Sequence, residues 1–207
     1  MPRVTCERCS RPQTVCYCHL IRPVANRWPV QILQHHKEAG HPLNTARIAA
    51  LSLAHCAVLP CSDTSNDADL QHGVLAQGCQ PILIYPSAAS VPIDSLDLQP
   101  SNALLFIDAS WRKSRRLYLQ SPWLQGLPAC HVRPASPSRY RLRKEPQPHC
   151  LSTLEAIVSV LEAVGDSSAE SANSPASMLA VMDWMIARQL AAFDTDSAFQ
   201  TKIDSGT

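Results

Sequence analysis

The sequence predicts an α/β fold, a parallel sheet flanked by helices, with a small cysteine-rich segment at the N-terminus. Short apolar segments of strand length alternate with helical segments along most of the chain. Several apolar segments end in polar residues, as strands of α/β proteins do where they form a binding site. The length of 207 residues suits one domain with a small appendage.

The composition excludes several classes of protein. The chain lacks an uncharged apolar run of the roughly 18 residues that a membrane span needs, and no apolar secretory signal precedes the first cysteines. We therefore expect a cytoplasmic protein without membrane contact, whose nine cysteines do not form a disulfide framework. Motifs of P-loop, α/β-hydrolase, zinc-protease and dinucleotide-binding proteins are absent. The oligomeric state stays open, with a monomer slightly favoured.

The net charge of +1 conceals strongly segregated charge. Residues 109–144 carry nine Lys/Arg and no acid, and residues 1–47 carry seven Lys/Arg against two acids. Residues 48–108 carry six acids and no Lys/Arg. Two basic blocks indicate a localised surface for a polyanion, with nucleic acid as the first candidate. For the first block, a solvated basic face that only maintains solubility is an equal alternative.

The N-terminal segment carries a candidate metal site. Its four cysteines, within thirteen residues, are Cys6, Cys9, Cys16 and Cys18. Thiolates at this spacing can close a tetrahedral site without help from distant sequence, and we expect zinc. Four free thiols in a flexible tail and an iron–sulfur cluster are the alternatives. His19 follows directly, either as a further ligand or as a bystander.

The first strand is predicted at residues 29–33. It leads into a polar cluster, residues 34–38, which is either a site or a surface loop. Asn44 or Thr45 then caps a helix that runs to about residue 55. Residues 56–59 form the next strand, residues 62–71 a loop or short linker, and residues 81–86 a third strand.

Residues 104–107 form a buried strand that ends in Asp108-Ala109-Ser110-Trp111. A basic helix follows as far as residue 120. Its spacing places Trp111, Ser114, Leu117 and Tyr118 on one side and Arg112, Arg115 and Arg116 on the other. A cationic side of this kind binds phosphates without reading sequence. A buried strand ending in a lone carboxylate beside a cationic helix indicates a reaction centre that faces a polyanion.

The C-terminal third begins with a strand at residues 129–132 and a basic, proline-interrupted passage, residues 133–144. Ser152 and Glu155 then form a capping box for a helix with a buried apolar stripe. The N-terminus of that helix suits a carboxylate or a phosphate, although a well-capped helix without a ligand is the simpler interpretation. A last helix spans residues 177–193. The cysteines outside the N-terminal segment are expected to be small buried hydrophobic residues: Cys56, Cys61, Cys79, Cys130 and Cys150.

Taken together, these stretches resemble the DTW-domain family, the tRNA-uridine aminocarboxypropyltransferases. The matching stretches are the four N-terminal cysteines with Arg11-Pro12, His35 and Glu38 with Asn44-Thr45, Asp108-Ala109-Ser110-Trp111, Arg143-Lys144-Glu145-Pro146, and residues 151–156. They follow the family's order along nearly the whole chain. One departure is Ser110, which replaces the threonine of the name-giving triplet. Serine keeps the hydroxyl group, so we expect function to survive without the β-branched packing.

The resemblance implies a SPOUT-like fold with a C-terminal knot that holds S-adenosylmethionine. It also implies transfer of the 3-amino-3-carboxypropyl group to N3 of a tRNA uridine, with release of methylthioadenosine. The compact length is that of a bacterial member. We expect a zinc knuckle in residues 1–27, a catalytic domain in residues 28–195 and a tail in residues 196–207. The alternatives are a SPOUT-type RNA methyltransferase with the same donor, and a zinc-knuckle RNA-binding module without catalysis.

Asp108 is the candidate base for the uridine N3 proton. It has two alternative roles, holding the donor's amino group or capping the following helix. Trp111 either stacks on a base or belongs to the core. The residues expected to bind S-adenosylmethionine are Tyr85, Pro86, Asp108, Ser110, Trp111, Leu151, Ser152 and Thr153. The residues expected to bind RNA are His35, Arg112, Arg115, Arg116, Arg143 and Lys144.

Overall fold

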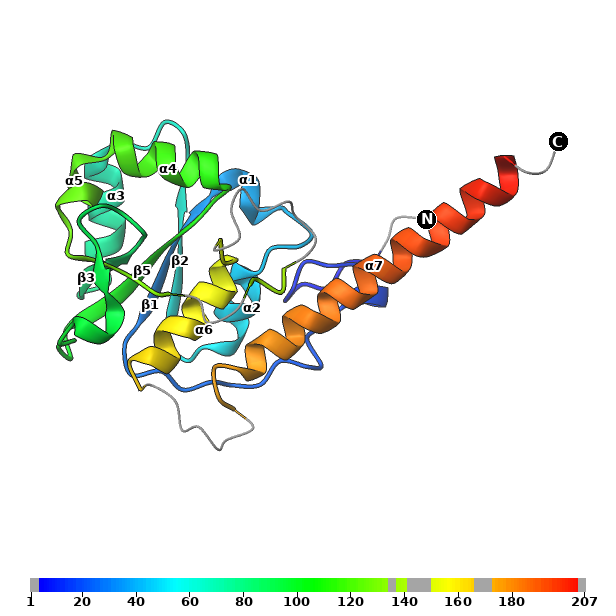
Figure 1. Cartoon of the computed structure of the whole chain (residues 1–207), viewed down its shortest axis with the longest axis horizontal. Helices are drawn as coiled ribbons and strands as arrows, with labels where there is room; N and C mark the ends of the chain where they lie inside the picture. The colour runs from blue at the N-terminus through cyan, green and yellow to red at the C-terminus, as the bar shows by residue number, and fades with distance from the viewer. Residues whose placement is uncertain (1–3, 134–136, 141–149, 166–172, 205–207) are drawn as a thin grey trace.

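A computed structural model of the chain describes residues 4–133, 137–140, 150–165 and 173–204, with side chains as far as residue 191. Six strands form one sheet in the order β2-β1-β5-β3-β6-β4, and every pairing within it is parallel (Figure 1). The strands are β1 (Val30–His35), β2 (Cys56–Cys61), β3 (Gln80–Ile84), β4 (Val91–Pro92), β5 (Asn102–Asp108) and β6 (Ala129–His131). The predicted α/β fold with a parallel sheet is thus confirmed.

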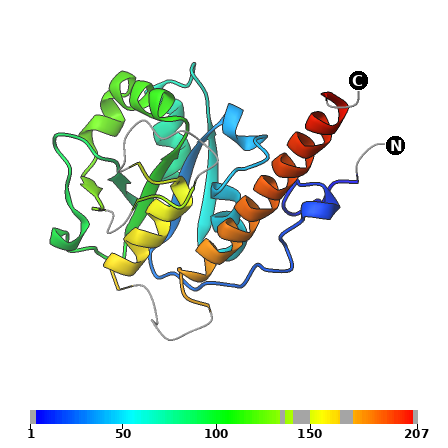
Figure 2. The same ribbon diagram turned by 45° about the vertical axis from the view of Figure 1, so that its right-hand side comes forward.

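Helices cover both faces of the sheet (Figures 1 and 2). They are α1 (His36–Ala39), α2 (Ala46–Ser52), α3 (Asp67–Leu75), α4 (Trp111–Gln120), α5 (Pro122–Gly126), α6 (Thr153–Ala163) and α7 (Ser177–Asp204), with short 3₁₀ helices at Gln13–Val15 and Ile93–Ser95. Helices α2, α6 and α7 pack in one hydrophobic core, and α3, α4 and α5 pack in a second core on the opposite face. No described helix combines the length and the hydropathy that crossing a bilayer requires.

Strand β5 lies in the middle of the sheet and explains why residues 104–107 are so apolar. Leu104 and Phe106 face the first core, whereas Leu105 and Ile107 face the second. A central parallel strand is covered by helices on both sides, so both sets of alternating side chains must be apolar.

The connections after β1 and β5 leave the sheet in opposite directions. Strand β1 continues into α2 on the first face, and β5 continues into α4 on the second face. The two strands are direct neighbours, and Gln34 pairs with Asp108 at their carboxyl ends. Diverging connections leave a crevice at such a point, which is where open α/β sheets bind ligands.

The prediction of a loop over residues 62–71 was wrong, because α3 begins within it. The Asn66 side chain caps this helix by accepting a hydrogen bond from the Asp69 backbone N–H at 2.9 Å. Leu70 and Val74 are buried one turn apart. The acidic residues that suggested a solvated loop belong to the first helical turn, where negative charge is favourable.

Two other helix boundaries also differ from the prediction. Helix α2 ends at Ser52 rather than near residue 55, and α7 continues to Asp204 rather than ending at residue 193. The end of α7 extends beyond the rest of the domain (Figure 1). Helix α5 was not predicted, although Ser121 caps it and Pro122 occupies its first turn, both common at helix starts.

The N-terminal segment packs into the first core instead of forming a flexible tail. Cys9 and Tyr17 are almost fully buried there. The Arg11 side chain, 4% exposed, donates to the Pro42 carbonyl at 2.7 Å. The Arg47 side chain donates to the carbonyls of Cys9 and Ala39. Two cations of the first basic block therefore brace the fold, so they contribute neither to a solvated face nor to a polyanion surface.

Candidate functional site

A cleft opens at the carboxyl edge of the sheet. Its volume is about 1830 Å³, compared with roughly 300–1,000 Å³ for ordinary small-molecule pockets. Its walls come from the residues that follow β3, β5 and β6, from the first turns of α4 and α6, and from residues 43–45. The cleft therefore has room for a cofactor-sized donor together with part of a second substrate.

Asp108 lines this cleft, and side chains from two neighbouring elements donate hydrogen bonds to its carboxylate. Its Oδ2 accepts a hydrogen bond from Gln34 Nε2 at 2.8 Å, and its Oδ1 accepts one from Thr153 Oγ1 at 2.6 Å. Gln34 is its register partner on β1, and Thr153 is the first residue of α6. Both of these donors are side chains, and Ser110 occupies the capping position of α4. The two hydrogen bonds therefore join the Asp108 carboxylate to β1 and to α6.

The first turn of α6 forms the wall beside Asp108. Ser152 and Glu155 make the predicted capping box: each side chain accepts a hydrogen bond from the other residue's backbone N–H. Residues 151–153 line the cleft, so the positive end of the helix dipole lies at its surface. The structure thus places a carboxylate and an anion-binding helix terminus side by side.

Glu155 also fastens residues 137–140 over this helix terminus. Its side chain is 6% exposed and accepts from Ser138 Oγ at 2.8 Å and from the Arg139 backbone N–H at 2.6 Å. The next residue, Tyr140, donates its hydroxyl to the Leu43 carbonyl at 2.9 Å and lines the cleft. Tyr140 could not be predicted as a cleft residue, because this contact joins residues 97 positions apart.

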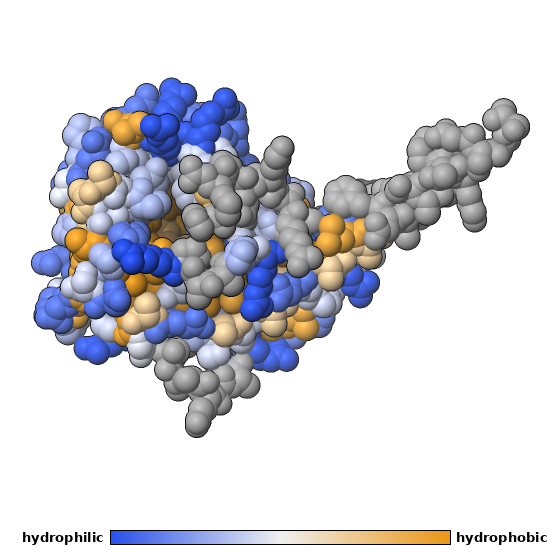
Figure 3. All heavy atoms as spheres, viewed as in Figure 1, coloured by the Kyte–Doolittle hydropathy of each residue, from blue (hydrophilic) through white to orange (hydrophobic). Residues whose placement is uncertain are grey.

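The opposite wall of the cleft is α4. Arg112, Arg115 and Arg116 are exposed, and hydrophilic side chains gather over this helix (Figure 3). Ser114 is buried, whereas Trp111 is 37% exposed and lines the cleft, which excludes the alternative that Trp111 belongs to the core. Its position at the start of α4, beyond the end of β5, explains the exposure.

Two tyrosines join the α4 wall to the end of β3. The rings of Tyr85 and Tyr118 stack with centroids 4.6 Å apart. Burial raises the pKa of Tyr85, so its phenol stays protonated near neutral pH. The pair forms an aromatic surface in the cleft.

His35 is not among the residues that line this cleft. The imidazole is 3% exposed; its Nδ1 accepts from the Lys37 backbone N–H, and its Nε2 lies 3.5 Å from Asp63 Oδ1. Burial lowers the pKa of His35. Partial desolvation raises the pKa of the Asp63 carboxyl, but the neighbouring His35 and Arg116 lower it more, so the pKa of Asp63 lies below its usual range. This degree of burial argues against the predicted direct contact of His35 with RNA.

The cleft gathers most of the residues that the sequence singled out. All eight residues expected to bind the donor line it, as do the three arginines of α4. Arg143 and Lys144 lie outside the described residues. Gln34 belongs to the polar cluster that the sequence marked, but its link to Asp108 depends on the strand order.

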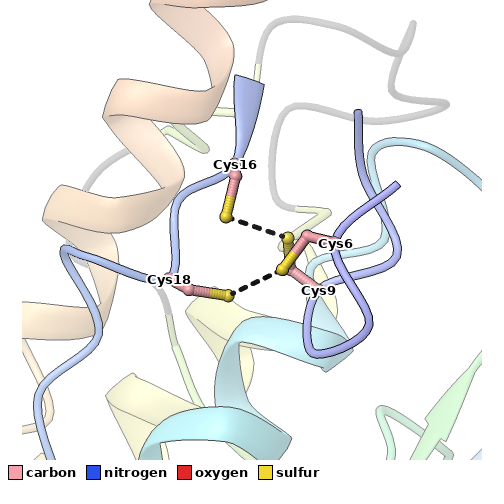
Figure 4. A group of neighbouring side chains, drawn as sticks. All are labelled: Cys6, Cys9, Cys16 and Cys18. Atoms are coloured by element: carbon pink, nitrogen blue, oxygen red, sulfur yellow. Dashed lines mark hydrogen bonds between the residues drawn. The ribbon is translucent and has the colours of Figure 1, made fainter. Parts of the chain in front are cut away.

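The four N-terminal cysteines form a compact cluster (Figure 4). Their sulfur atoms all lie within 4.8 Å of one another, and Cys6–Cys18 and Cys9–Cys16 are 3.7 Å apart. Tetrahedral zinc with Zn–S bonds of about 2.3 Å places its sulfurs roughly 3.8 Å apart. An iron–sulfur cluster puts several atoms between its thiolates and needs wider spacing. The geometry and the soft donor set therefore fit a single zinc ion.

The surroundings of the four cysteines favour the thiolate form at some positions and oppose it at others. Backbone N–H groups of Cys9 and Arg8 lower the pKa of Cys6 to about 6. Burial and the neighbouring sulfurs raise the pKa of Cys18. A metal ion at the centre would favour the thiolate form of every member, because it neutralises their mutual repulsion. His19 contacts the Trp184 ring edge-on at 5.5 Å, which is consistent with a packing role.

The remaining cysteines only partly match the prediction. Cys61, Cys130 and Cys150 are buried, whereas Cys56 and Cys79 are partly exposed. Burial raises the pKa of Cys56, Cys61 and Cys130 to about 12, so these thiols stay protonated and unreactive.

Comparisons with known proteins agree on one family. The model of the DTW domain matches residues 3–190. The tRNA-uridine aminocarboxypropyltransferase 2 of Drosophila melanogaster is 35% identical over 167 residues, which cover 77% of this chain and 66% of that protein. The mouse protein of the same name is 28% identical over 171 residues, covering 77% and 57%. The tRNA-uridine aminocarboxypropyltransferase A of Arabidopsis thaliana is 27% identical over 192 residues, covering 78% and 73%. No solved structure matches the chain. The chain thus spans less than two thirds of the length of its Drosophila and mouse relatives.

Proposed function

Because the chain belongs to the DTW-domain family, we propose that it is a tRNA-uridine aminocarboxypropyltransferase. Its donor is S-adenosylmethionine, its acceptor is N3 of a tRNA uridine, and its by-product is methylthioadenosine. One observation carries the proposal: Thr153, the first residue of the capped helix α6, is hydrogen-bonded to Asp108 inside the large cleft. A SPOUT-like fold with a C-terminal knot, and action in the cytoplasm, are parts of the same proposal.

The transferred group carries an ammonium group and a carboxylate on one carbon, and the site offers a partner of opposite charge for each. The α-amino group is a cation and binds the Asp108 carboxylate. The α-carboxylate binds the backbone N–H groups at the positive end of α6. The 2.6 Å hydrogen bond between Asp108 and Thr153 keeps the carboxylate next to the first residue of α6. This geometry favours the role of donor anchor for Asp108 over that of base.

Anchoring both charges fixes one end of the transferred group, and the reacting carbon is at its other end. That carbon is bonded to a sulfonium, which is already a good leaving group. The site then has to hold the carbon in line with N3 of the uridine, and correct alignment alone accelerates such reactions greatly. Asp108, Thr153 and the first turn of α6 supply this alignment.

The tRNA is expected to approach from the α4 side. Arg112, Arg115 and Arg116 are exposed there and bind backbone phosphates without reading the sequence. Trp111 at the edge of the cleft offers a surface on which an unstacked base can lie. Zinc in the cysteine cluster has a structural role in closing the N-terminal segment and does not take part in the transfer.

Incubation of the purified protein with S-adenosylmethionine and unmodified tRNA tests the proposal. Mass spectrometry should find an aminocarboxypropyl-uridine in the tRNA and methylthioadenosine in solution. S-adenosylhomocysteine and a methylated nucleoside would instead establish a methyltransferase. RNA binding without either product would indicate a binding module that does not catalyse.

A variant comparison tests the role of Asp108. Asp108→Ala is expected to weaken donor binding by about 10- to 100-fold, because a charge-assisted contact contributes about 1.5–3 kcal/mol. Asp94→Ala removes an exposed carboxylate outside the cleft and serves as the control. Calorimetric titration with S-adenosylmethionine measures both variants, and equal affinities would remove Asp108 from the donor site.

A further inference from the structure

His131 is a titratable residue in the cleft to which the proposed function gives no role. It is the last residue of β6 and lines the cleft. Ala129 faces the second core, and side chains two apart on a strand share a face. The His131 side chain therefore lies on the face covered by α4, where the tRNA is expected to approach. Asp108 shares its face with Phe106, on the α6 side.

The hydrogen bonds around Ser90 assign the tautomer of this imidazole. Ser90 Oγ donates its only proton to the Ser87 carbonyl at 2.8 Å and accepts the Ser87 backbone N–H at 3.1 Å. The same oxygen lies 2.9 Å from His131 Nδ1. With the Ser90 proton on the Ser87 carbonyl, the third contact of this oxygen is an Nδ1–H that His131 donates. In the neutral imidazole, Nε2 is then the nitrogen with a free lone pair.

Ser87, which is hydrogen-bonded to the same Ser90, provides a second polar group in the cleft wall. Its backbone N–H and carbonyl are both bonded to Ser90, which fixes the position of the residue. Its own hydroxyl is buried and has no hydrogen-bond partner among the described residues, and the residue lines the cleft. The acceptor nitrogen of His131 and the hydroxyl donor of Ser87 therefore belong to the same part of the cleft wall.

The sheet register sets the separation between the strands that carry His131 and Asp108. Cys130 pairs with Ile84, and Ile84 pairs with Phe106, so β6 lies two strands from β5, or about 10 Å. The path from Asp108 to His131 comprises a hydrogen bond to the donor's amino group, the donor's three-carbon chain, an attack distance of about 3 Å and a second hydrogen bond, in total roughly 12 Å along a bent path. The separation of the two strands is compatible with this path.

We propose that His131 is the general base of the transfer: Nε2 accepts the N3–H of the acceptor uracil, and the Ser87 hydroxyl donates to an adjacent carbonyl. This inference rests on the proposed function. The uracil edge presents an N–H donor flanked by carbonyl acceptors, which is the complement of these two groups. Cytosine presents an unprotonated ring nitrogen, which mismatches the lone pair of His131 Nε2. The pair thus serves both proton removal and base selection.

The step balances as one substitution. The N3–H bond breaks, its proton moves to His131 Nε2, and its electron pair forms the bond from N3 to the donor's terminal carbon. The bond from that carbon to sulfur breaks, and its electron pair neutralises the sulfonium. The products are modified uridine, methylthioadenosine and an imidazolium that releases its proton to solvent. No further reactant is required.

The test compares transfer by the wild-type protein and by His131→Ala. General bases contribute about 10²- to 10⁴-fold, so the variant is expected to lose this much in kcat, while its affinities for S-adenosylmethionine and tRNA change little. Added imidazole should restore part of the rate. His72→Ala, at an exposed site on α3 outside the cleft, is the control and should match the wild type with and without imidazole. Ser87→Ala should lose about 2- to 10-fold in kcat/KM.

A wild-type rate in His131→Ala would overturn the assignment of the base. If that variant does not fold, His131→Gln keeps a side-chain N–H for Ser90 but provides no base, and its rate is judged by the same criterion. Failure of the wild-type protein to produce any aminocarboxypropyl-uridine would refute the proposed function itself, and the base with it. The two failures are therefore distinguishable.

Discussion

Replacing Glu155 by glutamine tests whether one buried carboxylate holds the donor side of the cleft together. Its Oε2 accepts from Ser138 Oγ and from the Ser152 backbone N–H, both at 2.8 Å, and its Oε1 accepts from the Arg139 backbone N–H at 2.6 Å. Glutamine has one acceptor oxygen, which can replace Oε2. Its amide nitrogen then faces the Arg139 N–H, so two donors oppose each other.

The expected cost follows from these contacts. A buried N–H left without an acceptor costs about 1–3 kcal/mol, and the two remaining hydrogen bonds lose the strengthening that a charged acceptor gives. We expect Glu155→Gln to lower the free energy of unfolding by about 2–3 kcal/mol. Glu155→Ala should cost more, because it also removes half of the capping box.

Urea unfolding followed by circular dichroism measures the difference. Glu162→Gln is the matched control, because Glu162 lies on the same helix but is exposed. Its change should stay within about 0.5 kcal/mol, as is usual for surface substitutions. A loss below 0.5 kcal/mol for Glu155→Gln as well would refute the view that this carboxylate fastens residues 137–140 to α6.

Three other predictions address the metal, the RNA surface and pH. The purified protein should contain about one zinc per chain, and chelation should lower its melting temperature, because the metal binds only the folded segment; elemental analysis without zinc would contradict this. Arg115→Glu with Arg116→Glu should weaken tRNA binding and flatten its dependence on salt concentration by about one to two phosphate contacts. The charge-matched pair Arg22→Glu with Arg27→Glu should leave that slope unchanged. Burial lowers the pKa of His35 in the folded protein below its value in the unfolded chain, which is about 6.5. The neutral imidazole therefore stabilises the fold fully above about pH 6.5, and this contribution is lost as the pH falls through the lower pKa of the folded state. His35→Gln should therefore flatten the fall in stability below about pH 6.5 in urea titrations, and an unchanged slope would contradict it.

Features encoded by neighbouring residues were the most predictable. The capping box needs only Ser152 and Glu155, and the four clustered cysteines all lie within one short segment, so local spacing sufficed to predict the cap and the cluster. Strand β5 was recognisable because burial on both faces requires an unbroken apolar run. In each case the cause of the structure lies within a few positions.

Features that depend on strand order were not predictable. Asp108 meets Gln34 across 74 positions and Thr153 across 45, and nothing local to Asp108 encodes either contact. His131 looked like an ordinary strand residue, because its partner Ser90 is brought close only by the pairing of β4 with β6. Helix α3 was missed for another reason: its acidic first turn resembles a loop in composition.

The place of β5 in the sheet has a consequence for how the protein forms during synthesis. β1 pairs with β2 early, but β3 has no sheet partner until residues 102–108 are inserted between it and β1. The two halves of the sheet therefore remain separate until this last central strand arrives. Asp108 ends that strand, so the candidate site cannot exist in a partly folded chain. A ribosome-bound chain truncated before β5 should show no donor binding and little protection from proteases, because closing such long-range contacts is the slow and costly part of folding.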